Sequence, residues 1–255
     1  MIDKKKEFEN YFKMADDSQQ EGDFVGALDN IEKCIEIDPE NVHCIFSRGI
    51  ILAELDRSDE SLIVFESIIK NYSTEFKDMI HYVYYSMGMI YDEKEAADKA
   101  MECFDKCIEL NPDFPQAYYQ KGVCYFDVEE NDKALDLFNK ALNLEEHYYE
   151  ALFARGHVYF EKSEFEKAIQ DFSNIINEVE DEFQDSSIFL SRAMCYFEMD
   201  EFEKALNDLN TSIELNPEEI EAYDYRAHVH EKLGNTEEFK KDIEKFNELV
   251  QQIEF

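Results

Sequence analysis

The sequence predicts an all-α protein built as an array of antiparallel helix pairs, and three observations support this prediction. Large apolar residues recur at helical spacing along the chain. Prolines recur at one point of the same period, where a helix would end. Small residues recur at steps of 34, 39, 34, 34, 37 and 34 residues, at Ala15, Gly49, Gly88, Gly122, Gly156, Ala193 and Ala227. A period of this length is typical of helical repeat arrays.

The period divides the chain into seven repeats, and we expect them to form a single solenoid over residues 1–255. With the small residue numbered as position 8, extra residues fall at 76–80 and 183–185. The repeats span residues 8–41, 42–75, 81–114, 115–148, 149–182, 186–219 and 220–253.

Each repeat is predicted to contain two helices. In the first helix, a large residue stands four positions before the small one, and the middle four repeats add a tyrosine at position 11. In the second helix, position 20 is small in the first six repeats. Position 24 is large and apolar in all seven: Ile31, Phe65, Phe104, Phe138, Phe172, Leu209 and Ile243. Small residues allow close helix packing, and Pro39, Pro112 and Pro217 at position 32 end the second helix.

These positions together resemble the tetratricopeptide repeat, over residues 8–253. The resemblance implies a right-handed superhelical solenoid whose first helices line a concave surface. It also implies protein binding rather than catalysis. The last repeat departs from the pattern, with Phe239 at position 20, and is predicted to cap the array. Its apolar stripe is expected to contain Phe239, Ile243, Phe246, Val250 and Ile253, with Lys240, Lys241, Glu244, Lys245, Glu248, Gln251 and Gln252 facing water.

Charged residues at two positions predict an ion pair within each of the last three repeats. Position 7 holds arginine and position 23 holds aspartate in these repeats. The pairs are Arg155 with Asp171, Arg192 with Asp208, and Arg226 with Asp242. Because no nucleophile accompanies these pairs, we expect them to be structural.

The charge balance indicates which classes of partner the protein can bind. The chain has 61 acidic and 25 basic residues, for a net charge of −36. This charge disfavours nucleic acid and membrane surfaces and favours other proteins with basic segments, although solubility alone would also explain it. No stretch approaches the roughly 20 apolar residues of a spanning helix, and residues 1–11 lack an apolar signal core. A cytoplasmic protein is therefore expected.

The glycines, the prolines and the spacing of possible catalytic or metal-binding residues give no sign of an enzyme. Glycines and prolines are accounted for by packing and turns, and no phosphate-binding loop, nucleophile motif or metal-site spacing is present. We predict no cofactor, no metal and no catalytic residue. The six cysteines, Cys34, Cys44, Cys103, Cys107, Cys124 and Cys195, are predicted to be reduced core residues.

The resemblance assigns the concave surface to positions 2, 5, 9, 12 and 13. Read from the sequence, these positions give aromatic and apolar residues beside a row of acids at position 13. The candidate peptide-binding residues are Phe46, Tyr85, Met89, Tyr119, Phe126, Asp127, Phe153, His157, Phe160, Glu161, Leu190, Met194, Phe197 and Glu198. The row of acids also contains Glu54 and Glu93. Some of the rings, at position 5 above all, are equally explained as core residues.

Two functions remain open at this point. The first is a non-enzymatic adaptor that binds a basic, partly apolar peptide, since rings supply buried area and carboxylates supply register. The second is an acidic structural or regulatory protein that self-associates or masks a basic partner. Binding of an acidic chaperone tail is disfavoured. Relatives that bind such tails carry basic residues and asparagine where this chain has Phe12, Asp16, Tyr82 and Ser86. The oligomeric state is left open.

Overall fold

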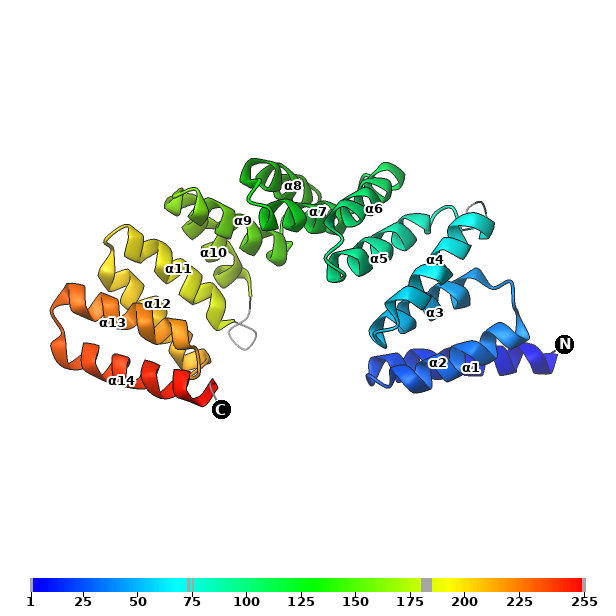
Figure 1. The fold of residues 1–255 in the computed structure, drawn as a ribbon, viewed down its shortest axis with the longest axis horizontal. Coiled ribbons are helices and arrows are strands. Elements are labelled where there is room, and N and C mark those ends of the chain that lie inside the picture. The colour runs from blue at the N-terminus through cyan, green and yellow to red at the C-terminus, as the bar shows by residue number, and fades with distance from the viewer. Residues whose placement is uncertain (1, 73, 75, 180–184, 254–255) are drawn as a thin grey trace. The chain divides into compact units, whose positions relative to one another are not determined.

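The computed structural model describes residues 2–72, 74, 76–179 and 185–253 (Figure 1), and within them it contains fourteen α-helices and no strand. The first helix of each repeat is α1 (Ile2–Gln20), α3 (Val42–Glu54), α5 (Ile80–Glu93), α7 (Pro115–Asp127), α9 (Tyr149–Glu161), α11 (Ser186–Glu198) and α13 (Ile220–Leu233). The second helices are α2 (Phe24–Ile37), α4 (Ser58–Tyr72), α6 (Ala97–Leu110), α8 (Asn131–Leu144), α10 (Phe165–Glu178), α12 (Phe202–Leu215) and α14 (Thr236–Ile253). The predicted all-α class and the pairing of helices are confirmed. No helix in this described part of the chain is long and apolar enough to cross a lipid bilayer.

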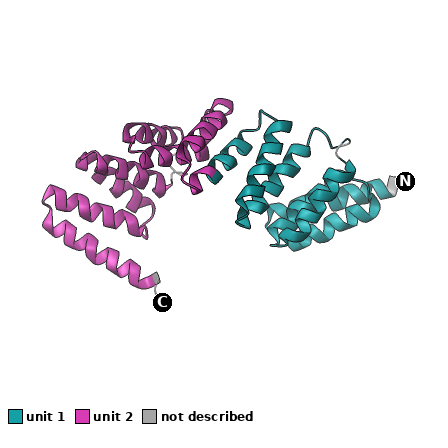
Figure 2. Cartoon of the chain, turned by 45° about the horizontal axis from the view of Figure 1, so that its top comes forward, with its two compact units in different colours: residues 1–124 teal, residues 125–255 magenta. Residues whose placement is uncertain are grey.

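The helices form two compact units, residues 1–124 and residues 125–255 (Figure 2). In the first unit, α1 packs on α2, α3 on α4 and α5 on α6, and α2 and α4 each also pack on the first helix that follows. In the second unit, the pairs α9 with α10, α11 with α12 and α13 with α14 repeat this arrangement. The core of each unit is therefore a succession of helix pairs.

Small and large residues fit together between the two helices of a repeat. A Cβ atom added at Gly156 would lie 2.6 Å from Cε1 of Phe172, a side chain with no exposed surface. A Cβ atom added at Gly49 would lie 2.5 Å from Cε1 of Phe65, and one added at Gly88 would lie 2.5 Å from Cε1 of Phe104. In repeat 6 the small residue is Ala193 and position 24 is Leu209, both fully buried. Glycine at position 8 thus lies opposite phenylalanine at position 24, and the larger alanine lies in the repeat with the smaller leucine, as close packing requires.

The turn between the two helices of a repeat requires a left-handed residue at position 15. Gly22 and Gly234 occupy it with φ of 76° and 77°. The other five repeats place non-glycine residues there at φ of 56° to 60°: Asp56, Glu95, Glu129, Ser163 and Asp200. Side chains with a Cβ are strained in this conformation.

We therefore expect Ser163→Gly to raise the free energy of unfolding by about 0.5–1 kcal/mol, because relief of left-handed strain exceeds the entropy cost of glycine. Gly234→Ala is the matched reverse change, since nothing lies within 4 Å of the added Cβ. It should destabilise by a similar amount. Chemical denaturation followed by circular dichroism measures both. Two changes of the same sign would show that backbone conformation does not decide stability at position 15.

The prolines end helices as predicted. The helices α2, α6 and α12 stop two residues before Pro39, Pro112 and Pro217, and Pro115 begins α7. The six cysteines are buried thiols that form no disulfide, as predicted. Burial raises the pKa of Cys107 to about 12, so this thiol stays protonated at physiological pH.

The first insertion does more than lengthen a turn. Phe76 has 2% of its surface exposed and lies with its ring 5.6 Å from that of Phe46 and 5.2 Å from that of His43. It therefore adds to the core of the first unit. In the second insertion, residues 183 and 184 lie outside the described residues, whereas Asp185 caps α11 by accepting a 2.8 Å hydrogen bond from the Ser187 amide.

The terminal helix α14 is amphipathic, as a cap requires. All of the predicted polar residues of this helix are exposed except Lys245, which is half-buried. Phe239, Ile243, Phe246 and Val250 are half-buried, and the side chain of Ile253 lies outside the described residues. The most buried positions are Asp242 and Leu249, each 4% exposed, and the predicted stripe did not include Leu249.

The three predicted ion pairs are confirmed and are bidentate. Arg155 donates to Asp171 at 2.8 and 2.7 Å, and Arg192 donates to Asp208 at 2.7 and 2.8 Å. Burial alone would lower the pKa of Arg192, but its hydrogen bonds to Asp208 raise the pKa overall. The pairs therefore join the two helices of a repeat through charge-assisted hydrogen bonds.

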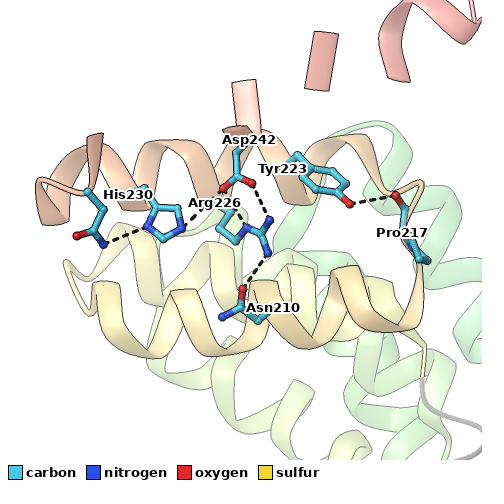
Figure 3. A network of polar contacts seen from close by, with 7 residues as sticks. Asn210, Pro217, Tyr223, Arg226, His230 and Asp242 are labelled. Atoms are coloured by element: carbon cyan, nitrogen blue, oxygen red, sulfur yellow. Dashed lines mark hydrogen bonds and ion pairs between the residues drawn. The ribbon is translucent and has the colours of Figure 1, made fainter. Parts of the chain in front are cut away.

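Figure 3 shows the third pair in its surroundings. Arg226 donates to Asp242 at 2.9 and 2.6 Å and, through Nη1, to Asn210 of the preceding second helix at 2.9 Å. Nε2 of His230 lies 3.8 Å from the same carboxylate. Arg155 and Arg192 make the equivalent third contact, to Asn139 and Ser173. Each arginine therefore ties three helices together.

Candidate functional site

Five exposed carboxylates stand at the C-terminal ends of five successive first helices. Each is the last residue of its helix: Glu54 of α3, Glu93 of α5, Asp127 of α7, Glu161 of α9 and Glu198 of α11. The C-terminal end of a helix already carries partial negative charge from its unpaired carbonyl groups. Carboxylate and helix end therefore add to a negative potential that attracts cations.

The rings at position 5 face mainly inward, toward the second helix. Tyr85 lies 6.1 Å from Phe104 and 5.2 Å from Phe114 between ring centroids, and Phe153 lies 5.8 Å from Phe172. The equivalent ring of Phe46 lies between Phe65 and Phe76. Leu190 is buried, and Tyr119 is half-buried. The side chains at position 5 therefore expose at most part of their surface.

The candidate residues at positions 9 and 12 are half-buried. Phe160 and Phe197 each contact the phenylalanine at position 17 of their own repeat edge to face, at centroid distances of 5.5 and 5.8 Å. Phe197 also meets Tyr225 at 5.8 Å. Phe126, Met89, Met194 and His157 are half-buried as well. These side chains form the apolar part of the surface next to the acids.

His157 lies between neighbouring first helices of the second unit. Its Nε2 is 3.3 Å from the Ser191 hydroxyl, and its ring meets Phe153 edge to face at 4.5 Å. Burial lowers the pKa of His157, which keeps the imidazole neutral at pH 7. The histidine therefore adds no positive charge next to the acids of this surface.

A pocket of about 230 Å³ opens between α3 and α5 in the first unit. Its apolar wall contains Ile50, Ala53, Met89 and Ile90, with Tyr85 and Ser86 beside them, and Glu54 and Glu93 also line it. The pocket brings together the candidate residues Tyr85 and Met89 and two of the position-13 carboxylates. It combines apolar walls with negative charge.

Comparison with known proteins agrees with this architecture. A family model described as the tetratricopeptide repeat matches residues 81–114 and 115–148, and a second model with that description matches residues 186–219. The chain is a tetratricopeptide repeat protein. No curated protein matches the sequence.

Solved structures of other proteins share the fold. One from Parabacteroides merdae, described as a tetratricopeptide repeat protein, has a TM-score of 0.65 at 19% identity, covering 96% of this chain and 93% of its own. PilF of Pseudomonas aeruginosa has a TM-score of 0.71 at 15% identity, covering 88% and 99%. YrrB, described as having an unusual peptide-binding site, has a TM-score of 0.59 at 21% identity, covering 75% and 95%. At these identities the likeness concerns the fold alone.

The sequence prediction missed four lining residues of the pocket in this tetratricopeptide repeat protein: Ile50, Ala53, Ser86 and Ile90. One feature of the sequence could have indicated this pocket. Position 12 is phenylalanine in repeats 4, 5 and 6 but is Ala53 in repeat 2. A small residue where other repeats place a ring leaves unfilled space.

Proposed function

We propose that this protein is a non-enzymatic cytoplasmic scaffold that binds basic, partly apolar segments of other proteins along its first helices. The observation that carries the proposal is the row of five exposed carboxylates, each at the end of a first helix and beside half-buried apolar side chains. Within each unit, we call the surface formed by positions 5, 9, 12 and 13 the first-helix face.

Helix stability does not account for the row of acids. A carboxylate at a helix C-terminus opposes the helix dipole, whereas lysine or arginine there would stabilise the helix. No hydrogen bond or ion pair joins the side chain of Glu54, Glu93, Glu161 or Glu198 to another described residue. A locally unfavourable choice that recurs in five repeats supports a role in binding.

The apolar residues beside the acids account for the other half of the proposed specificity. Partly exposed methionine and aromatic side chains supply apolar contact area, and methionine adapts to differently shaped partners. Carboxylates at regular intervals would steer cationic partners and fix their register. A segment carrying both leucine-like and cationic side chains fits this surface better than a purely charged one.

Selection from a display library of random 12-residue peptides tests the proposal. Wild-type protein should enrich peptides in which lysine or arginine neighbours leucine, methionine or phenylalanine. Their affinity should fall with added salt, because exposed charges are screened beyond about 10 Å at 0.1 M ionic strength. Enrichment of acidic peptides, or affinity that does not depend on salt, would contradict the proposal.

Charge-reversal variants localise the binding. Glu54→Lys combined with Glu93→Lys should weaken the selected peptides at least tenfold. The matched control is Asp29→Lys combined with Glu66→Lys, which changes the charge equally at exposed sites on the second helices α2 and α4. Equal weakening by both pairs would show that overall charge, not the first-helix face, governs binding.

A further inference from the structure

We infer that the pocket between α3 and α5 receives one arginine side chain of the bound segment. Its aliphatic stem would lie on Ile50, Ala53 and Met89, and its guanidinium between Glu54 and Glu93. The inference rests on the proposed function and names the residue type read at one place on the first-helix face.

Repeat 2 lacks two rings that repeats 5 and 6 carry at positions 12 and 17. In repeat 5, Phe160 at position 12 packs on Phe165 at position 17, with ring centroids 5.5 Å apart. Repeat 6 has the same pair in Phe197 and Phe202. Repeat 2 has Ala53 and Ser58 at these positions, so both large side chains are absent together.

The size of the pocket suits one side chain. Its volume of about 230 Å³ lies below the roughly 300–1,000 Å³ of sites for small molecules and cofactors. Its apolar walls come from two helices and the position-5 ring of Tyr85. A single long side chain of a peptide lying across α3 and α5 could enter without moving either helix.

Among the described residues, no cationic side chain forms an ion pair with Glu54 or Glu93. Two basic residues that line a neighbouring pocket together with Glu93 are already engaged: Arg57 donates to Glu60 at 2.8 and 2.7 Å, and Lys94 contacts Asp59 at 3.0 Å. That neighbouring pocket also holds both acidic partners and Asp56. The surroundings therefore keep an excess of negative charge that an incoming cation would offset.

Arginine meets these conditions better than other residue types. A purely apolar side chain would exclude water from the carboxylates without supplying a hydrogen-bond donor, and an acidic one would be repelled. Lysine offers a compact charge, whereas the planar guanidinium carries five donors and stacks on aromatic rings such as Tyr85. Long basic side chains also bury their stems while keeping the charged group near solvent.

Methyl NMR with single amino-acid probes tests the inference. Protein labelled at methionine and isoleucine methyl groups is titrated with N-acetyl-arginine methylamide and with the corresponding lysine, citrulline and leucine derivatives. We expect the Met89 and Ile50 signals to shift with the arginine probe at millimolar concentration, less with lysine, and at least tenfold more weakly with citrulline and leucine. Citrulline has nearly the shape of arginine but no charge.

Two variants complete the test. Ala53→Phe should abolish the shifts by filling the pocket, and Glu54→Gln with Glu93→Gln should weaken the arginine probe at least tenfold without changing shape. Both variants are first checked for wild-type helix content. Equal binding of citrulline or leucine, or unchanged binding by Ala53→Phe, would overturn the inference. If display selection still yields salt-sensitive basic peptides, the arginine site alone is wrong and the proposed function stands.

Discussion

Replacing Asp208 with alanine is expected to lower the free energy of unfolding by about 3–5 kcal/mol, because it leaves a buried guanidinium without its carboxylate. The Asp208 side chain is 3% exposed and that of Arg192 is 16% exposed. The remaining hydrogen bond, from Nη1 of Arg192 to Ser173 at 3.0 Å, and the rings of Phe189 and Tyr196, each 5.9 Å from the guanidinium carbon, supply no full negative charge. Denaturation by guanidinium chloride, followed by circular dichroism, measures the loss.

Two comparisons isolate burial as the cause. Glu60→Ala removes an equally bidentate partner, but from an exposed pair with Arg57, and should change stability far less. Arg192→Met combined with Asp208→Cys copies Met87 and Cys103, which occupy the same two positions in repeat 3 and are both buried. This double variant should recover much of the loss. If Asp208→Ala costs no more than Glu60→Ala, the buried pair does not stabilise the repeat.

Replacing Gly156 with alanine should destabilise the protein by roughly 1–3 kcal/mol, the usual cost of overpacking a core. Helix propensity alone predicts the opposite sign, since alanine is favoured over glycine within a helix by up to about 1 kcal/mol. The added Cβ would lie 2.6 Å from Cε1 and 2.8 Å from Cζ of Phe172, which is fully buried. Thermal and chemical unfolding would both report the change.

Coupling between the two positions provides the control. Gly156→Ala combined with Phe172→Leu copies Ala193 and Leu209 of repeat 6, where both side chains are fully buried. The double variant should therefore lose less stability than the two single variants together. Additive losses, or a stabilising Gly156→Ala, would show that this contact does not limit packing.

The sequence predicted the features that recur with the period. Position 8 and position 24 meet in the core, positions 7 and 23 form ion pairs in three repeats, and the proline at position 32 follows the end of a helix. Each of these features lies within one helix pair, and its recurrence along the chain allows it to be recognised in the sequence. The third contact of each arginine crosses to the preceding repeat, so the pattern within one repeat did not reveal it.

Features that occur once were not predicted. Phe76 lies in an insertion and has no counterpart in other repeats, yet it is buried against Phe46. The pocket is lined by Ala53 where repeats 4, 5 and 6 carry phenylalanine, and a search for recurring residues overlooks such an absence. Helical periodicity also did not separate core from surface at position 5, because one apolar stripe contains both kinds of contact.

Mapping a selected peptide onto methyl signals tests the central claim most directly. The first-helix face is reported by Ile50, Met89 and Met194, and the second helices by Ile63, which is 66% exposed on α4, and by Ile108 on α6. If basic, partly apolar segments bind along the first helices, the peptide will shift signals of the first group and leave Ile63 and Ile108 unchanged. Shifts confined to the second helices would contradict the account.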